Sequence, residues 1–339
     1  MNLCTFSLTL ALLFAALAVC TRFVKPLHGL AFTFAVLAVG NAAVAYPPLF
    51  TAWGGFELKQ VISPLVQVII FGMGMTLTPD DFRRVLTMPR GVVLGCVLHY
   101  TIMPIGGFCF AHLFGLEGAV ATGLILIGSV PSGTSSNVIA LLARVNVPLS
   151  VTVTAVSTLI SPFVTPFAMK WLAGTYAPVA ATAMMLSILK MIVAPLVLGL
   201  VMHRYLPAVT ARLVRVLPYL AMLAICTIIG VTIAHSREQL LRMGLALFAA
   251  AVCHNATGYL LGYWGGRLAG LNRTDARTCA LEVGLQNGGM ATGLAFDVLK
   301  SPAAALASAV FGPWSAVTSS VLASWWRRTI PREGEQGAV

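Results

Sequence analysis

Eleven long apolar runs separated by short polar loops constrain this chain more than any other feature of its sequence. A run of about 20 apolar residues is long enough to cross the hydrocarbon core of a bilayer as a helix. The loops are too short to hold a soluble domain, so we expect an all-α polytopic membrane protein. The runs cover approximately residues 3–21, 28–46, 61–77, 91–115, 118–143, 148–173, 180–203, 216–234, 244–265, 276–298 and 302–326.

The composition and the net charge agree with this class. Hydrophobic residues make up 58% of the chain and charged residues 9%, whereas soluble domains carry about a quarter charged residues. The net charge of +11 does not indicate a nucleic-acid partner, because the arginines and lysines stand in loops between apolar runs. The seven cysteines are scattered and form no CxxC pair, so a zinc site is not expected.

The loop charges also orient the chain. Cytoplasmic loops are enriched in arginine and lysine. If every run crosses once, the arginine clusters fall on one side, which places the C-terminus and a polar tail at 329–339 in the cytoplasm. These clusters are Arg83, Arg84, Arg90, Arg204, Arg212, Arg215, Arg267, Arg273, Arg277, Arg327, Arg328 and Arg332. The first run lacks the positive start of a signal peptide, so we interpret residues 1–25 as an additional span. The alternatives are a cleaved signal and a lipoprotein-type cleavage before Cys20.

Two of the apolar runs carry polar residues where a membrane helix would be interrupted. The run at 118–143 contains Pro131 and Gly133, followed directly by Thr134, Ser135, Ser136 and Asn137. Proline removes a backbone donor and glycine relaxes the chain. The alternative interpretation is a proline kink whose freed backbone groups bind the serine and threonine hydroxyls.

The run at 276–298 repeats this pattern with other residues, Gln286 and Asn287 beside Gly288-Gly289, where we expect the break. Asn137 and Asn287 lie 150 residues apart, and the two breaks fall in the fifth and tenth runs, which are five positions apart, so the two segments run in opposite directions. Paired interrupted helices in two halves of similar length indicate an inverted-repeat secondary transporter.

Glu282 stands before the second predicted break, with no lysine or arginine in the same segment. A carboxylate at the bilayer centre costs at least about 2.5 kcal/mol, so a bound cation is expected to offset it. The neighbouring donors are hydroxyl, amide and backbone oxygens, which suit a hard cation such as sodium. The half-helix starts suit an anionic substrate. The alternative for Glu282 is a protonated acid hydrogen-bonded within the core.

Five stretches of the sequence resemble the bile acid:sodium symporter family, including its bacterial members. The matching stretches are FGMGMTLTPDDF (71–82), HYTIMP (99–104), PSGTSSNVIALLARVNVPLSVTVTAVSTLISPFVTP (131–166), CHNATGYLLGYWGG (253–266) and LEVGLQNGGMATGLA (281–295). Together they span most of residues 28–328.

The resemblance implies ten helices in two inverted five-helix repeats with two crossing, discontinuous helices, besides the additional first span. The repeats would be 26–173 and 180–328. A moving core would comprise 91–173 and 244–328, and a panel would comprise 28–77 and 180–234. The resemblance also implies residence in a bacterial inner membrane.

The resemblance also implies two sodium sites and a substrate site. The first sodium site would use Ser136, Asn137, Ser150, Thr154 and Glu282. The second would use Glu282, Gln286 and the backbone oxygens of Val283 and Leu285, with His99 where many members have glutamine. A neutral imidazole is a poor sodium ligand, so this site would be weakened or sensitive to protons; alternatively, His99 is a hydrogen-bonded core residue. Substrate would bind at Thr134, Ser135 and Asn287. Ser315 stands where some bacterial relatives have a histidine.

The predicted function is therefore sodium-coupled transport of a small organic anion, such as a bile acid or a pantoate-like carboxylate, with sodium as coupling ion and no organic cofactor. A proton-coupled or facilitated carrier, or an exporter, is the alternative. An intramembrane enzyme built on Ser136, His99 and Glu282 is a distant one, because the sequence contains neither a G-x-S-x-G elbow nor an HExxH pair.

Overall fold

A computed structural model describes residues 3–21, 23 and 31–329 of the chain. Within these ranges, eight helices are long and apolar enough to cross a membrane, and α2 and α7 are shorter apolar helices. The expectation of an all-α polytopic membrane protein is confirmed. Residues 1–2, 22 and 24–30, and the predicted tail from residue 330 onwards, lie outside the described residues.

The helices follow the predicted apolar runs closely. The first half of the chain contains α1 (Leu3–Cys20), α2 (Ala31–Ala45), α4 (Ile62–Thr76), α6 (Pro89–Leu113), α7 (Gly118–Ser129), α8 (Ser135–Ala143) and α9 (Val147–Ala168), which continues as the π-turn η3 (Met169–Ala173). The second half contains α10 (Ala181–Ile188), the π-turn η4 (Leu189–Val193), α11 (Ala194–Tyr205), α12 (Pro207–His235), α13 (Arg237–Leu268), α14 (Arg273–Gly284), α15 (Gly288–Asp297) and α16 (Pro302–Thr329).

Several short elements lie between these runs. They are α3 (Pro48–Thr51), a hairpin of β1 (Ala52–Trp53) and β2 (Phe56–Glu57), the 3₁₀ turn η2 (Leu58–Val61) and α5 (Pro79–Thr87). In α5, Thr78 and Asp81 form a capping box, and Pro79 occupies the first turn, which is a favourable helix start. Apolar periodicity does not reveal such polar elements, and it also placed the start of α12 at 216 rather than at Pro207.

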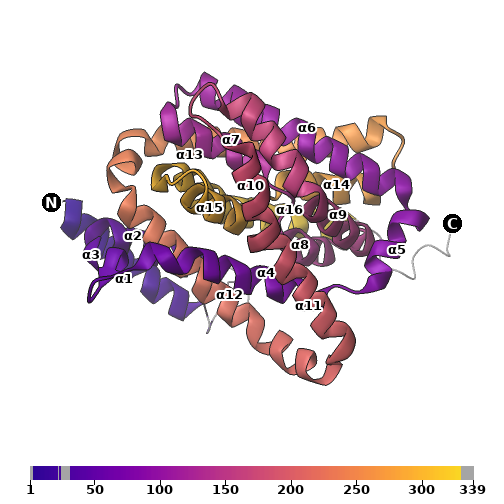
Figure 1. Ribbon diagram of the computed structural model, residues 1–339, viewed down its shortest axis with the longest axis horizontal. Helices are drawn as coiled ribbons and strands as arrows, with labels where there is room; N and C mark the ends of the chain where they lie inside the picture. Colours follow the sequence, from indigo (N-terminus) through magenta and orange to yellow (C-terminus); the bar gives the residue numbers. More distant parts are fainter. Residues whose placement is uncertain (1–2, 22, 24–30, 330–339) are drawn as a thin grey trace.

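Two groups of helices pack against each other. The helices α2, α4, α11 and α12 contact one another and lie along the lower side of Figure 1. The helices α6, α7, α9, α13, α14 and α16 form the second group. The half-helices α8 and α15 lie near the centre of the view. The additional helix α1 packs on α2.

Glycines allow α13 to approach α14 closely. A Cβ atom at Gly262 would stand 3.0 Å from the Cα of Ala280, and one at Gly258 would stand 2.9 Å from the Cα of Gly284. Small residues at such contacts let helix backbones meet inside a membrane. This contact fixes the end of α14, where the second interruption begins.

Candidate functional site

The two interruptions meet and pair with each other. Ser132, between α7 and α8, forms an isolated antiparallel bridge with Gln286, between α14 and α15. The Gly133 N–H donates to the Leu285 carbonyl at 3.0 Å, and the Asn287 N–H donates to the Pro131 carbonyl at 3.0 Å. Each break therefore satisfies main-chain groups that the other leaves open, as the hydrocarbon interior requires.

We expected the second break at Gly288-Gly289, but it lies just before these glycines. The helix ends at Gly284, residues 285–287 are not helical, and Gly288 and Gly289 are already the first residues of α15. The Asn287 side chain accepts from the Met290 N–H at 3.0 Å and caps this helix. The glycines thus stand at a helix start, and the pairing with residues 131–133 holds the break open.

Side chains from other helices bind the carbonyl ends of α7 and α14. The Thr165 hydroxyl donates to the Ser129 carbonyl at 2.7 Å. The Asn255 side-chain amide donates to the Gly284 carbonyl at 2.9 Å. The last carbonyls of a helix lack partners within it, so these bonds replace the partners that each interrupted helix has lost.

His99 joins the two broken segments. Its Nδ1 lies 2.9 Å from the Glu282 carbonyl, and its Nε2 lies 2.8 Å from the Val130 carbonyl. The imidazole is fully buried. Both nitrogens are thus engaged with backbone oxygens, and a neutral ring can donate only one of these two bonds. His99 lies where the resemblance placed it, next to Glu282, but its nitrogens contact carbonyls.

Glu282 lies at the centre of a cluster of oxygen donors. One carboxylate oxygen accepts from the Ser150 hydroxyl, and the other accepts from the Thr154 hydroxyl at 2.7 Å. The Asn137 Oδ1 lies 2.9 Å from the Ser150 hydroxyl and 3.3 Å from the Thr154 hydroxyl, and it competes with the carboxylate for their protons. The Ser136 hydroxyl lies 3.2 Å from that of Thr154. All five residues expected at the first sodium site therefore lie together.

This carboxylate has no basic partner among the described residues. The ion pairs found there join Lys59 to Glu57, Arg83 to Asp80, Arg84 to Asp81 and Lys300 to Asp297. Glu282 is fully buried, and an ionised carboxylate without a countercharge is expensive in such a place. The donor set fits a hard cation, because carboxylate, hydroxyl and amide oxygens surround one point.

The residues expected at the second sodium site adjoin this cluster. The Gln286 Nε2 donates to the Val283 carbonyl at 2.7 Å, and the Leu285 carbonyl accepts from Gly133. The Gln286 Oε1 is buried and has no hydrogen-bond partner among the residues that the structure describes. A buried acceptor without a donor is costly, and a cation or a water would satisfy it.

A cavity of about 180 Å³ opens at the other edge of the bridge. Thr134, Ser135 and Asn287, the expected substrate residues, line one side of it, with Gln286 and Ser315. An apolar wall faces them and includes Phe32 from α2, Ile69 from α4 and Ile225, Ile228 and Ile229 from α12. Figure 1 shows α8 and α15, which carry the polar side, close to the centre of the molecule.

Two helix starts line this cavity. The half-helix α8 begins at Ser135 and α15 begins at Gly288, and both residues line it. The positive dipole ends and free N–H groups of helix starts favour anions. No charged side chain lines the cavity among the described residues, so these two helix ends supply its electrostatic preference.

Ser132 is a residue of this site that sequence reasoning missed. Its side chain is fully buried, and its hydroxyl lies 3.3 Å from the Leu285 carbonyl. Its position between Pro131 and Gly133 was the available signal, because a polar residue inside a predicted break is placed to contact the opposite break.

Comparisons with known proteins agree with this architecture. The profile of the Sodium Bile acid symporter family matches residues 63–243. The uncharacterized sodium-dependent transporter YocS of Bacillus subtilis (strain 168) is 34% identical over 312 residues, which are 92% of this chain and 95% of YocS.

Plant proteins are similar to nearly the same extent. The probable sodium/metabolite cotransporter BASS1, chloroplastic, of Oryza sativa subsp. japonica is 33% identical over 310 residues, which are 89% of this chain and 74% of that protein. The protein of the same name from Arabidopsis thaliana is 34% identical over 268 residues, which are 79% of this chain and 67% of its own length. The chain is thus a multi-pass membrane transporter, not an enzyme, and it belongs to the sodium bile acid symporter family.

Proposed function

We propose that this protein is a secondary symporter that couples the movement of sodium to that of a small organic anion, of the bile-acid or pantoate-like carboxylate class. The observation that carries the proposal is the oxygen cluster around Glu282, which lies where two paired breaks converge. The relatives named as sodium-dependent transporters support sodium as the coupling ion.

The first sodium would bind among the oxygens of Glu282, Asn137, Ser136, Ser150 and Thr154. In the described structure the Ser150 and Thr154 hydroxyls bind the carboxylate, and the Ser136 hydroxyl binds that of Thr154. A sodium ion would take the place of these mutual hydrogen bonds and would offset the buried charge. A second sodium would use the unpartnered Gln286 Oε1, with Glu282 and the carbonyls of Val283 and Leu285.

Sodium binding would favour substrate binding because the two sites share the same backbone. Ser136 and Asn137 belong to α8, whose first residue lines the cavity, and Glu282 lies on α14 ahead of the segment that carries Asn287. Fixing these segments with an ion would hold Thr134, Ser135 and Asn287 in place for the anion. Two ligands that favour one conformation assist each other reciprocally.

Alternating access would follow from motion of one helix group against the other. The cavity lies between the half-helices and α2, α4 and α12, so a shift between the groups would change the side to which it opens. The core would comprise 91–173 and 244–328, and the panel 28–77 and 180–234. We place the protein in a bacterial inner membrane with its C-terminus in the cytoplasm.

Uptake into proteoliposomes tests this proposal. A panel of radiolabelled carboxylates would be offered with an inward sodium gradient, and uptake of at least one is expected to collapse when choline or potassium replaces sodium. A parallel arm would impose a proton gradient without sodium. Equal uptake in that arm would replace sodium coupling by proton coupling, and uptake without any gradient dependence would leave a facilitated carrier.

A further inference from the structure

A hydrogen bond ties the end of α2 to the start of α13. The Nε of Arg237, the first residue of α13, donates to the Val44 carbonyl at 2.9 Å. Val44 belongs to the last turn of α2, where carbonyls lack partners within their own helix and the helix dipole attracts a cation. Arg237 takes part in no ion pair within the described part of the chain. Its guanidinium therefore caps a helix of the other group.

A second bond of this kind joins α10 to α15. The Ser187 hydroxyl donates to the Asp297 carboxylate at 2.5 Å. Among the residues that the structure describes, these two bonds are the side-chain hydrogen bonds between the proposed panel and the half-helices or the second helix group. Asp297 ends α15 and Arg237 begins α13, both on the side opposite the arginine clusters. This is the outer side in the proposed orientation.

Two hydroxyls next to the first tie have no partner. Thr232 and Ser236 are fully buried, and neither hydroxyl has a hydrogen-bond partner among the described residues. They lie one turn apart, and Thr232 lies one turn beyond Ile228 of the polar cavity, so the three residues share one face of α12 and its end. A buried hydroxyl without a partner is costly. This cost favours an arrangement in which water reaches this face of α12.

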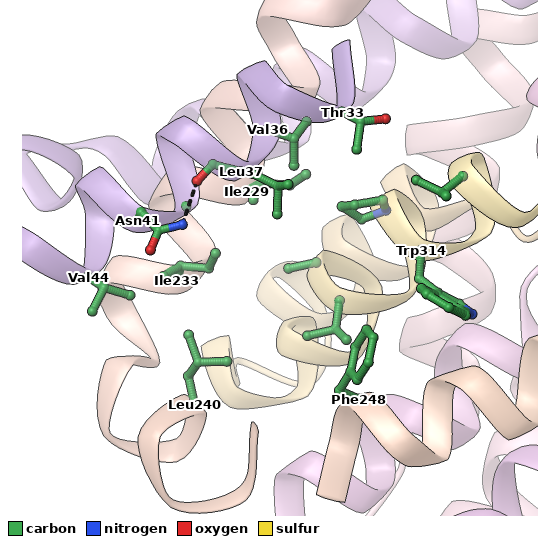
Figure 2. A pocket seen from close by; sticks show the side chains of 15 residues that line it. Thr33, Val36, Leu37, Asn41, Val44, Ile229, Ile233, Leu240, Phe248 and Trp314 are labelled. Carbon is green, nitrogen blue, oxygen red and sulfur yellow. Dashed lines mark hydrogen bonds between the residues drawn. The ribbon is translucent and has the colours of Figure 1, made fainter. Parts of the chain in front are cut away.

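The other contacts around the first tie are apolar. Figure 2 shows Val44, Ile233 and Leu240, from α2, α12 and α13, at one end of a cavity that all three line. Only Ser236 separates α12 from α13, so a small change at this junction would move the two helices relative to each other. Because apolar contacts are not directional, the Arg237 bond is the specific contact that fixes the end of α2 against the start of α13.

We propose that the Arg237–Val44 and Ser187–Asp297 bonds form a latch that keeps the outer side of the molecule closed. Opening the latch would expose the face of α12 that carries the two unpartnered hydroxyls, and would connect the polar cavity to the outer side. The latch depends on the proposed function, in which the panel moves against the core. Arg237 is then a positioning residue that sets the balance between the closed and the open form.

Thiol labelling tests the latch. Ser236→Cys places a thiol on the buried face, and protein in nanodiscs would be treated with a charged maleimide. Peptide mass spectrometry would follow this thiol and the native Cys279, which is also fully buried. Adding Arg237→Gln is expected to speed labelling at position 236 about tenfold, as the loss of one hydrogen bond to a charged group would, while Cys279 stays unreactive. Equal rates with and without Arg237→Gln would overturn the latch.

Two further variants separate a latch from a loss of structure. Arg237→Lys keeps a cationic donor for the Val44 carbonyl and is expected to leave labelling at position 236 slow. Arg242→Gln removes an exposed arginine from the same helix and should also leave it slow. A rise in every variant, or a parallel rise at Cys279, would indicate general loosening and would count against the latch.

The latch and the proposed function can fail separately. Labelling needs neither a substrate nor a gradient, so a facilitated carrier with the same motion would still respond to Arg237→Gln. Conversely, sodium-coupled uptake together with unchanged labelling would leave the transport function standing and remove the latch. Ser187→Ala is expected to increase labelling further in the Arg237→Gln protein, and an unchanged rate would remove the Ser187–Asp297 bond from the latch.

Discussion

The two interrupted helices contain different residues at their breaks, and they carry their polar side chains on different sides of those breaks. The first contains proline within its break, at Pro131, and carries its polar donors after the break, at Ser136 and Asn137. The second has no proline, and it carries its acid before the break, at Glu282. The oxygen cluster therefore combines the later half of one segment with the earlier half of the other.

This difference shows that only one break is dictated by its own residues. Proline and glycine prevent a continuous helix across 131–133. Nothing comparable stands at 285–287, where the extended backbone is instead paired with the first break. The second segment is thus held open by its partner, and changes at the two breaks should have unequal effects.

The largest expected effect concerns the acid that only the second segment supplies. Glu282→Gln keeps the volume and a hydrogen-bonding capacity but removes the charge that would hold sodium. Removing one partner of a buried ion pair costs about 3–5 kcal/mol, so sodium-dependent uptake should fall by on the order of a hundredfold or more. Glu117→Gln, in an exposed loop, serves as the control. Undiminished sodium dependence in the Glu282 variant would remove this residue from the coupling role.

The next effect compares the glycines of the two breaks. A Cβ at Gly133 would lie 2.6 Å from the Gln286 carbonyl oxygen, whereas the nearest atom to one at Gly289 would be 3.6 Å away. Gly133→Ala should therefore destabilise the protein by about 1–3 kcal/mol, whereas Gly289→Ala should leave its stability unchanged or raise it by up to about 1 kcal/mol, because alanine favours a helix over glycine. Thermal unfolding of the two purified variants measures the contrast. Equal midpoints would contradict the view that the first break holds the second open.

A smaller effect is expected at Thr154, whose hydroxyl contacts side chains of both interrupted segments. Thr154→Val removes the hydroxyl that contacts Glu282, Asn137 and Ser136. A hydrogen bond to a charged group is worth about 1.5–3 kcal/mol, so the sodium concentration for half-maximal uptake should rise about tenfold. Thr122→Val, whose hydroxyl binds only the Gly118 carbonyl of its own helix, should leave it unchanged. A similar rise in both variants would point to general destabilisation.

The smallest effect concerns the far ends of the segments. The residue Asn146 that follows α8 binds Asp275 of α14 at 2.7 Å, whereas Asp297 at the end of α15 binds Ser187 of α10 at 2.5 Å. Ser187→Ala should therefore remove a bond between α10 and α15 and lower the stability by about 1 kcal/mol. Ser320→Ala, which loses a bond within its own helix, is the matched control for the thermal unfolding measurement.

Much of the fold could be predicted from the sequence because a helix that crosses the hydrocarbon core requires a continuous run of apolar residues. Each apolar run became a helix or an interrupted helix, and the first break was visible in Pro131 and Gly133. The second break was placed three residues too late, because glycines were taken as its cause. The real cause is a main-chain pairing between distant segments, which no local pattern in 281–293 displays.

The site could be predicted only where the chemistry of a residue type implies what must surround it. Glu282 indicated a cation site because a buried acid needs an offset, and the family resemblance supplied Ser136, Asn137, Ser150 and Thr154, which the structure brings together. The two contacts of His99 and the apolar wall of the cavity depend on packing between helices far apart in sequence. Polar elements such as α5 were missed, although the Thr78-Pro79-Asp80-Asp81 start was readable as a helix cap.

The mutual bridge between Ser132 and Gln286 has a consequence for the ancestry of such molecules. Either half alone would present open amide and carbonyl groups to oil at its midpoint. If the halves are the inverted repeats that the family resemblance implies, a forerunner encoding a single half would have needed a second copy in the opposite orientation to pair these groups. Gene duplication and fusion would then have joined two copies that already depended on each other for their backbone hydrogen bonds.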